Sequence, residues 1–415
     1  MKKRIIGAIV LILVVIIAIL WWREQRTASG PLQKVTASAE RVAHGRYLVQ
    51  AADCSACHTA PGGAPLAGGY GLDTPFGKIY GSNLTPSADH GIGRWTRDEF
   101  YRALTTGVAP GGRHIYPAMP YTSYKSISRD DADAMYDYLM TRPAVEVSPP
   151  ANEMSFPFNQ RMLMIGWNLL FNSSQPLPAT SQGESASWLQ GRYLVDVLGH
   201  CGECHTPRGI FGQLKTDAGL QGGNLGRIAA PDITPNGLAA RGWTSDSLAR
   251  FLSHGIAAQG SAFDEMHKVI DLSTRHLTAD DNRAMVSYLL GDNPPAAKVL
   301  PTGKGNASGY QVYLDQCSAC HGREGQGKPH VAISMVGNAT LSQPDSRNLI
   351  VSVLDGLPAQ NFPGNEAMQS MPGFADRLDD AQMADLVNYL RATWGGLPET
   401  ITPAQVQEWR HAKPQ

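Results

Sequence analysis

An unbroken apolar run opens the chain. It extends over eighteen residues, from Ile5 to Trp22, and follows three basic residues. A helix rises about 1.5 Å per residue, so the run measures about 27 Å, close to the roughly 30 Å hydrocarbon core of a bilayer. Its last two residues are tryptophans, which are typical of a membrane interface. We predict a membrane anchor over residues 1–22 and a tether over residues 23–40.

A cleaved signal peptide is the alternative interpretation of this run. The apolar part of a signal peptide usually has about 7 to 15 residues and ends near a small-x-small site. Here the nearest such site, Ala37–Ala39, begins fifteen residues beyond the end of the run. We therefore favour an uncleaved anchor, with its basic start in the cytoplasm and the rest of the chain outside.

Two long segments that follow match each other, and each contains one C-x-x-C-H motif. The matching pieces lie 146 to 149 residues apart: residues 45–49 and 191–195 (both GRYLV), Asn83–Pro86 and Asp232–Pro235, and Trp95–Thr96 and Trp243–Thr244. A nearly constant offset is typical of two copies of one domain. A third unit also contains the motif but lacks the Thr-Pro and Trp-Thr pieces, so we expect a shorter variant.

All three units end in the same pattern. A residue that can cap a helix stands ten residues before a Tyr-Leu pair, and acidic residues follow it; the caps are Ser128, Thr278 and Asp379. Such caps, with apolar residues at helical spacing, predict a closing helix in each unit. We expect its Tyr-Leu face to be core that packs against the motif-bearing helix.

A connection over residues 147–187 separates the first two units. It contains a ten-residue apolar run, Met162–Phe171, and a polar stretch, residues 173–187. Ten residues are too few to span a bilayer. The run could dock on a partner or on the bilayer surface, but we favour packing across the first two domains.

Charge excludes one large class of function. The 415 residues include 35 Lys and Arg against 36 Asp and Glu, which gives a net charge of −1. Nucleic-acid binding needs a strong basic excess, so nucleic acid is not an expected partner. At about 150 residues per domain, the length predicts two or three domains.

The positions of the cysteines indicate the chemistry of the chain. All six cysteines belong to the three C-x-x-C-H motifs: Cys54 and Cys57, Cys201 and Cys204, and Cys317 and Cys320. This motif is typical of c-type haem attachment. A thioredoxin-like pair would need neither the histidine nor three copies, and zinc sites built from two Cys-x-x-Cys units would leave one unit over. We predict three covalently bound haem c groups, with His58, His205 and His321 as proximal iron ligands.

The sixth iron ligand decides between electron transfer and ligand chemistry, because methionine there gives a saturated electron carrier. Met119 lies 65 residues after Cys54, and Met266 lies 65 residues after Cys201. The equal spacing in two copies of one domain predicts that both methionines are ligands. His267 is a rival to Met266, but we rank it lower because proline stands at its counterpart position in the first unit.

In the third unit we predict Met371 as the ligand, because it stands in a Met-Pro-Gly loop just before the closing helix. Met368 and Met335 are its rivals. Met135 and Met285 correspond in the first two units but lie within closing helices, where methionine is usually core. Histidines outside the motifs have no such support, and we interpret them as polar residues of the surface or next to the haem.

Several of these motifs are similar to those of one known family. They are the GRYL segments before the first two haem motifs, Asn83–Pro86, Gly91–Thr96, Tyr116–Tyr121, Phe156–Asn159 and Trp167–Phe171. Over about residues 40–395 the chain resembles the triple-haem cytochrome c subunits of bacterial membrane-bound dehydrogenases for alcohols, aldehydes, gluconate or sorbitol. The resemblance implies a catalytic dehydrogenase subunit as partner, which passes electrons to the cytochrome for delivery to ubiquinone or a downstream oxidase. Members often carry a cleavable signal peptide, and the loop around Met266 departs from the Tyr-Pro-x-Met-Pro pattern of the first unit.

The expected fold is therefore all-α: an N-terminal transmembrane helix followed by three class I-like cytochrome c domains. The domains are expected at residues 41–146, 188–300 and 301–396, with a C-terminal tail over 397–415. We expect the anchor in the bacterial inner membrane and the haem domains in the periplasm, where haem c is attached.

The favoured function is an electron-transfer subunit with no catalytic residues of its own. A multi-haem peroxidase is the alternative from the enzyme class, but it needs an iron with an exchangeable position, and three candidate methionines argue against it. A c-type subunit of a terminal oxidase is a further alternative, which the three-unit pattern disfavours.

Overall fold

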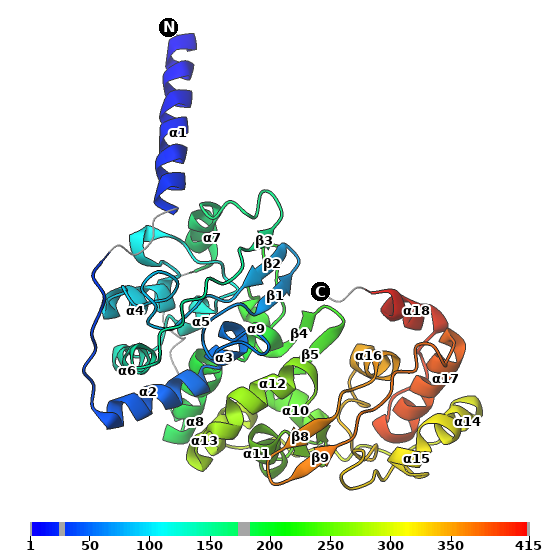
Figure 1. Cartoon of the computed structure of the whole chain (residues 1–415). Helices are drawn as coiled ribbons and strands as arrows, with labels where there is room; N and C mark the ends of the chain where they lie inside the picture. The colour runs from blue at the N-terminus through cyan, green and yellow to red at the C-terminus, as the bar shows by residue number, and fades with distance from the viewer. Residues whose placement is uncertain (1, 25–29, 173–182, 413–415) are drawn as a thin grey trace. The chain divides into compact units, whose positions relative to one another are not determined.

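The computed structural model in Figure 1 describes residues 2–24, 30–172 and 183–412. Parts of the predicted tether, linker and tail lie outside these residues. The chain divides into two compact units: unit 1 comprises Met1–Ser181 with Asp196–His200, and unit 2 comprises Gln182–Val195 with Cys201–Gln415. Helices dominate both units, but the described residues also form four small antiparallel sheets. The expectation of an all-α fold is therefore only partly correct.

Unit 1 begins with the apolar helix α1, which ends two residues beyond the predicted anchor. Among the described helices, α1 is the one long and apolar enough to cross a bilayer. Strands β1, β2 and β3 form one sheet, in which Gly71 pairs with Tyr80 and Gly77 with Met154. The elements are α1 (Lys2–Glu24), α2 (Ala39–Ala51), α3 (Cys54–His58), β1 (Gly71–Thr74), β2 (Gly77–Tyr80), α4 (Arg97–Thr106), η1 (Pro110–Gly112), α5 (Tyr121–Tyr124), α6 (Arg129–Met140), β3 (Glu153–Met154) and α7 (Leu163–Phe171).

The described residues after 182 contain two further helical arrays and three two-stranded sheets. The first array comprises α8 (Ala186–Arg192), η2 (Tyr193–Leu198), α9 (Gly202–His205), η3 (Thr216–Ala218), β4 (Gln221–Leu225), β5 (Ile228–Asp232), α10 (Pro235–Ala240), α11 (Ser245–His254), β6 (Ile256–Ala257), β7 (Gly260–Ser261), α12 (Asp264–Leu272), η4 (Thr274–His276) and α13 (Ala279–Leu290). The second comprises α14 (Ala307–Gln316), α15 (Ser318–His321), α16 (Arg347–Asp355), β8 (Gln360–Phe362), β9 (Glu366–Met368), α17 (Asp380–Leu390), η5 (Arg391–Gly395) and α18 (Pro403–His411).

The three closing helices start where their caps predict. The Ser128 hydroxyl accepts a hydrogen bond from the backbone N–H of Asp131 at 3.0 Å, at the start of α6. Thr278 and Asp379 cap α13 and α17 in the same way. Each cap satisfies one of the backbone donors that the first helical turn leaves unpaired. The predicted closing helices are thus confirmed.

Each closing helix crosses an earlier helix at a glycine. A Cβ added to Gly45 of α2 would lie 1.9 Å from the carbonyl oxygen of Ala134 of α6. The same holds for Gly191 against Ala284, at 1.8 Å, and for Gly309 against Asp385, at 2.1 Å. Only a residue without a side chain fits at such a crossing. The tyrosines of the Tyr-Leu pairs, Tyr138, Tyr288 and Tyr389, pack against these same glycines.

The leucines of the Tyr-Leu pairs belong to the core. Leu139, Leu289 and Leu390 are buried on their closing helices, as the sequence predicts. In the last array the core also includes Tyr313 and Trp394, whose rings meet edge to face at 5.2 Å. The helix pairs therefore hold the motif helices α3, α9 and α15, each of which follows the crossing helix closely in sequence.

The two arrays of unit 2 are joined by polar contacts. The side chain of Asn348 on α16 accepts a hydrogen bond from the Ala229 N–H at 2.8 Å and donates to the Ala229 carbonyl at 2.7 Å. Arg227 contacts the Asp355 carboxylate at 2.7 Å. Apart from Asp196–His200, the second and third repeats therefore belong to one compact unit.

Candidate haem-binding sites

The three motif histidines share one hydrogen-bonding arrangement. The Nδ1 atom of His58 lies 2.6 Å from the Ser82 carbonyl oxygen, that of His205 lies 2.7 Å from the Pro231 carbonyl, and that of His321 lies 3.0 Å from the Ile333 carbonyl. A carbonyl can only accept, so Nδ1 carries the proton and Nε2 keeps its lone pair for a metal. Histidines that bind a metal are usually oriented by such a second hydrogen bond.

Burial favours the neutral form of these imidazoles. It lowers the pKa of His58, His205 and His321, because the charged ring loses its hydration. A neutral imidazole is the form that binds a metal. Tautomer and charge state therefore both suit iron ligation by Nε2.

Glycines let a loop pass directly over the first two motif helices. A Cβ at Gly81 would lie 1.8 Å from the Cys57 carbonyl oxygen, and one at Gly223 would lie 2.0 Å from the Cys204 carbonyl oxygen. Gly81 immediately precedes Ser82, whose carbonyl holds His58. These glycines were not predicted from the sequence, because Gly81 stands 24 residues after Cys57 and Gly223 only 19 residues after Cys204, so no constant spacing marks them.

A turn built on one polar side chain follows the histidine acceptor in the first two repeats. The Asn83 Oδ1 atom accepts hydrogen bonds from the backbone N–H and the hydroxyl of Thr85, at 2.8 and 2.7 Å. Asp232 accepts the equivalent pair from Thr234 at the same distances. Such turns fix the local backbone. They therefore hold the carbonyls of Ser82 and Pro231 in place.

The third repeat has a related turn, which was not predicted from the sequence. Asn338 Oδ1 accepts a hydrogen bond from the Thr340 N–H at 2.9 Å. No proline follows this threonine, and Asn338 stands closer to its motif than Asn83 does to the first one. A search for Asn-x-Thr alone, without fixed spacing, would have found it.

The six motif cysteines are not paired with one another in disulfides. Cys57 and Cys320 are exposed, whereas Cys54, Cys201, Cys204 and Cys317 are half-buried. Burial raises the pKa of Cys54 and of Cys317 to about 12, so neither thiol ionises readily at neutral pH. Within the described residues, no cluster of three or more His, Cys, Asp or Glu is placed so that it could hold a metal ion.

The three predicted methionine ligands are all half-buried. Met119 lies in the loop before α5, where its carbonyl accepts a hydrogen bond from the Tyr121 N–H at 2.8 Å. Met266 lies in the first turn of α12 and not in a loop like its counterpart. Met371 exchanges two backbone hydrogen bonds of 2.9 Å with Leu357.

The rival methionines lie in regular structure or in the core. Met135 and Met285 are buried on α6 and α13, as expected for core residues. Met335 packs against the hydrophobic core of the third repeat, and Met368 belongs to strand β9.

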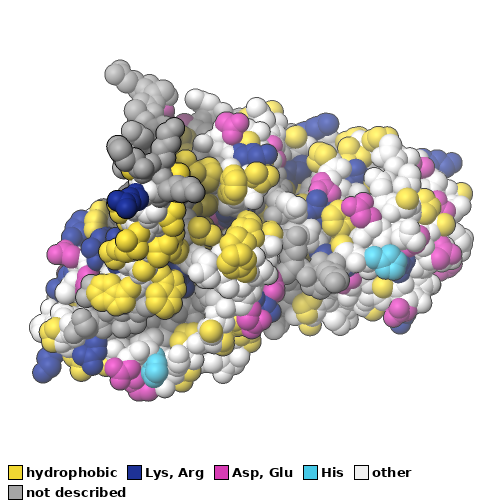
Figure 2. All heavy atoms as spheres, turned by 90° about the horizontal axis from the view of Figure 1, so that it is seen from above, with side chains coloured by type: hydrophobic (Ala, Val, Ile, Leu, Met, Phe, Trp, Pro, Cys, Tyr) yellow, Lys and Arg dark blue, Asp and Glu magenta, His cyan; other side chains and the backbone are white. Residues whose placement is uncertain are grey.

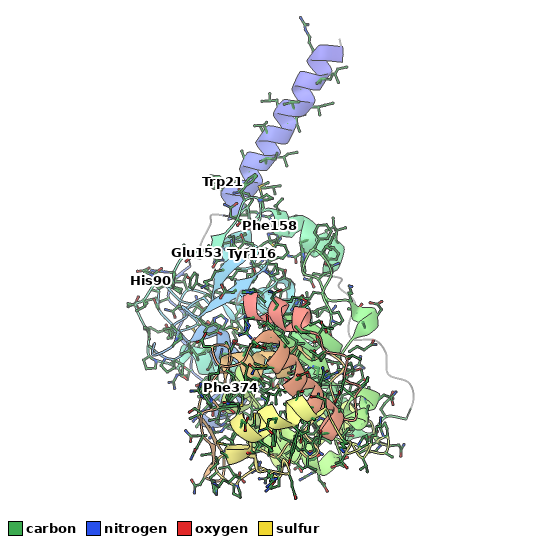
Figure 3. All side chains as sticks on the ribbon, turned by 90° about the vertical axis from the view of Figure 1, so that its right-hand side faces the viewer. Trp21, His90, Tyr116, Glu153, Phe158 and Phe374 are labelled. Carbon is green, nitrogen blue, oxygen red and sulfur yellow. The ribbon has the colours of Figure 1, made fainter. Side chains whose placement is uncertain are left out.

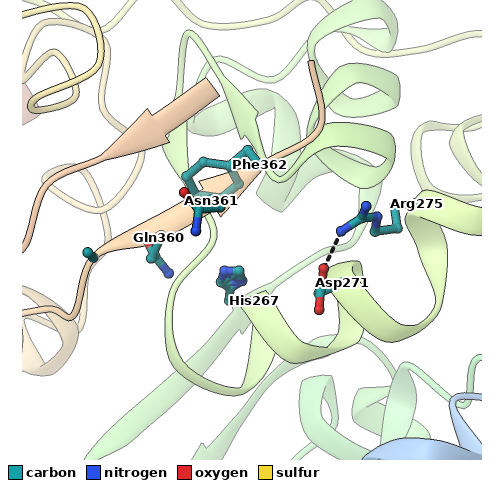
Figure 4. Close-up of a pocket in the computed structure, with 7 residues that line it drawn as sticks. His267, Asp271, Arg275, Gln360, Asn361 and Phe362 are labelled. Atoms are coloured by element: carbon teal, nitrogen blue, oxygen red, sulfur yellow. Dashed lines mark hydrogen bonds and ion pairs between the residues drawn. The ribbon is translucent and has the colours of Figure 1, made fainter. Parts of the chain in front are cut away.

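His267, the rival to Met266, faces a cavity of about 370 Å³ within unit 2 (Figure 4). Its ring stacks on Phe362, with ring centroids 5.3 Å apart and planes inclined by 21°. Asp271 and Arg275, which form an ion pair, line the same cavity. The His267 ring is thus engaged by the third repeat.

Comparison with known proteins identifies the family. Residues 40–139 match the family model described as cytochrome c oxidase, cbb3-type, subunit III, and residues 307–394 match the model described as cytochrome c. The cytochrome c subunit of the quinone-dependent alcohol dehydrogenase of Gluconobacter oxydans is 35% identical, over 89% of this chain and 82% of its own. The gluconate 2-dehydrogenase cytochrome c subunit of Pantoea cypripedii is also 35% identical, over 89% of each chain. This chain belongs to the family of dehydrogenase cytochrome c subunits.

One relative is much longer than this chain. A subunit of the nicotinate dehydrogenase of Pseudomonas putida is 38% identical over 94% of this chain, but the chain spans only 34% of its length. Among solved structures, the as-isolated thiosulfate dehydrogenase of Marichromatium purpuratum aligns with 72% of this chain and 59% of its own. Its TM-score of 0.18 and identity of 14% are too low for an inference about fold.

Membership of this family identifies the C-x-x-C-H motifs as haem-attachment motifs. Cytochrome c domains bind haem c covalently through C-x-x-C-H cysteines and the adjacent histidine. The carbonyl-bound Nδ1 atoms and the glycines over the motif helices fit that group. As a cytochrome c subunit, the chain is an electron-transfer component and not a catalytic subunit.

Proposed function

We propose that this chain is a membrane-anchored cytochrome c with three haems. It relays electrons from a periplasmic dehydrogenase catalytic subunit to ubiquinone or the respiratory chain. The observation that carries the proposal is the threefold repetition of one arrangement: a helix crossing at a glycine, a following C-x-x-C-H motif and a histidine whose Nδ1 meets a carbonyl.

The residue assignments follow the repeats. Three cysteine pairs attach the haems, namely Cys54 and Cys57, Cys201 and Cys204, and Cys317 and Cys320. His58, His205 and His321 are the proximal ligands, and Met119, Met266 and Met371 are the distal ligands. The corresponding domains extend over residues 41–146, 188–300 and 301–396.

Bound haem c supplies a one-electron couple between ferric and ferrous iron. The chain's own residues position that couple and protect it. The Ser82, Pro231 and Ile333 carbonyls orient the histidines, and methionine at the sixth position leaves no site for peroxide or oxygen. Because all three sites belong to one polypeptide, transfer between them depends on geometry and not on encounter.

The partners follow from the anchor and from the relatives. Helix α1 supports an attachment to the inner membrane, where ubiquinone is found, with the haem domains in the periplasm. The relatives in Gluconobacter oxydans and Pantoea cypripedii are cytochrome subunits of dehydrogenases, which supports a catalytic subunit as the electron donor. The chemical identity of the donor's substrate is a property of that subunit.

A haem count tests the assignment. Expression in the periplasm with the haem-attachment machinery should give three covalent haems per chain, measured by intact mass and haem stain. Replacing both Cys201 and Cys204 with alanine should leave two. The control Ser55→Ala changes a motif position that attaches nothing and should keep three. A double cysteine variant that retains three haems would refute the assignment.

A further inference from the structure

The periplasmic end of α1 is fixed to unit 1. The Glu24 carboxylate lies 2.7 Å from Nδ1 of His114 and accepts a hydrogen bond from the His114 backbone N–H at 2.6 Å. Glu24 is 3% exposed and His114 is 7% exposed. A buried pair with two contacts holds its partners in one geometry, so the end of α1 is fixed to the loop that contains His114.

The loop that contains His114 and Tyr116 also contacts the segment before α7. The Arg161 guanidinium donates a hydrogen bond to the His114 carbonyl at 2.9 Å and lies over the Tyr116 ring, 4.5 Å from its centroid. The Tyr116 hydroxyl donates to the Phe158 carbonyl at 3.0 Å. The end of α1 and the Phe156–Phe158 segment are therefore fixed to one loop.

One face of α7 packs on unit 1. The Tyr121 hydroxyl donates to the side-chain oxygen of Asn168 at 2.7 Å, and the ring of Trp167 meets the ring of Tyr121 edge to face at 6.2 Å. Tyr121 opens α5, two residues after Met119. Helix α7 is thus held beside the predicted ligand loop of the first haem.

The other face of α7 is apolar, and the exposed fractions of its side chains are high. Leu169 is 86% exposed, Leu170 is 73% exposed, and Phe156 in the preceding segment is 80% exposed. No charged residue occurs between Met162 and Phe171. Figure 1 places α7 beside the base of α1, Figure 3 places Phe158 there, and Figure 2 shows hydrophobic side chains gathered on the side from which α1 projects. Large apolar surfaces of this kind mark a contact with a partner or a membrane.

We propose that this surface, called here the α7 patch (Phe156, Phe158, Leu163, Leu169 and Leu170), enters the outer leaflet of the membrane that α1 spans. The proposal rests on the proposed anchor. Glu24 follows Trp22 by only two residues, about 3 Å along the helix axis. Tryptophans prefer the headgroup level, so the unit 1 surface that buries Glu24 lies at that level too. The α7 patch flanks that surface and faces lipid.

The patch would make a monotopic contact in addition to α1. The nine-residue helix α7 cannot span the bilayer, but a helix that lies in the interface buries its apolar face about 5 to 10 Å deep. Two attachment points also restrict the tilt and rotation of unit 1. The Met119 loop then stays close to the membrane surface, where quinone head groups are accessible.

Lipid photolabelling of the full-length holoprotein tests this proposal. Vesicles of phosphatidylcholine and phosphatidylglycerol would contain a phospholipid with a photoactivatable diazirine on its acyl chain, and mass spectrometry would locate the adducts. We expect adducts on α1 and on Leu163, Leu169 or Leu170. The double variant Leu169→Glu with Leu170→Glu should reduce α7 labelling about tenfold or more, because burying glutamate in lipid is costly. The control Val299→Glu changes an equally exposed apolar residue of unit 2 and should leave the labelling of α7 unchanged.

The outcomes separate this proposal from the anchor on which it rests. Adducts on α1 with none on residues 156–171 would overturn the α7 proposal and leave the anchor intact, and the patch would then be assigned to a protein partner. An absence of adducts on both would overturn the anchor itself. An unchanged haem spectrum in the double variant would show that any loss of labelling does not come from unfolding.

Discussion

The imidazole of His267 stacks on the phenyl ring of Phe362, 95 residues later in the sequence, at a centroid distance of 5.3 Å. Phe362 belongs to β8 of the third repeat, and the neighbouring Gln360 donates a hydrogen bond to the Ala262 carbonyl at 3.0 Å. The β8 strand therefore packs on the segment that carries Met266. Burial lowers the pKa of His267, which keeps this ring neutral at physiological pH.

This contact makes a prediction about the second haem. If His267 serves to pack against Phe362, Met266 remains the axial ligand. Met266→Ala should then remove about one third of the near-infrared sulfur-to-iron band of the holoprotein, while His267→Ala leaves that band at full strength. A band that keeps its full strength in Met266→Ala would contradict ligation by Met266, and an altered haem spectrum in His267→Ala would then assign the iron ligand to His267.

The third haem allows a parallel comparison. Met371 forms two backbone hydrogen bonds with Leu357, whereas Met368 pairs with Gln360 in the β8–β9 hairpin. We expect Met371→Ala to remove about one third of the same band and Met368→Ala to have no effect on it. A band that is lost only in the Met368 variant would show that Met371 is the wrong choice.

The helix crossing predicts a stability effect in unit 1. Gly45→Ala would place a methyl group 1.9 Å from the Ala134 carbonyl, so the helices must move apart. Overpacking of this kind costs about 1 to 3 kcal/mol, and we expect a thermal midpoint several degrees lower, measured by circular dichroism of the holoprotein.

Gly166→Ala is the matched control for this change. Gly166 also lies in a helix of unit 1, but a Cβ there would meet no atom within 4 Å. Alanine favours a helix over glycine, so the control should be neutral or slightly stabilising. Equal destabilisation by both substitutions would contradict the importance of the crossing.

Local signals in the sequence predicted much of this fold. The apolar run of α1 is continuous in the sequence, and the caps Ser128, Thr278 and Asp379 act within the first turn of a helix; each of these signals corresponds to a helix in the structure. The short strands were missed because, at two to five residues each, they are too short to show an alternation of polar and apolar residues. Strand β4, for example, has the sequence QGGNL.

Long-range contacts were not predictable in the same way. The Ile333 carbonyl that binds His321 belongs to no repeated motif, and the stacking of His267 on Phe362 joins two repeats. The contacts of Asn348 and Arg227, which join the second and third repeats within one compact unit, were likewise not predicted. Nothing in the residue pattern indicated which face of α7 packs on Tyr121.

The central claim is that the chain relays electrons and performs no substrate chemistry. Stopped-flow spectroscopy of the full-length holoprotein in vesicles that contain ubiquinone tests this most directly. We predict that the chain alone oxidises no alcohol, aldehyde or sugar acid. Its haems should be reduced promptly when the catalytic subunit and its substrate are added, and ubiquinone should then reoxidise them. Oxidation of such a substrate by the chain alone, or rapid reduction of peroxide at one of its haems, would contradict the relay.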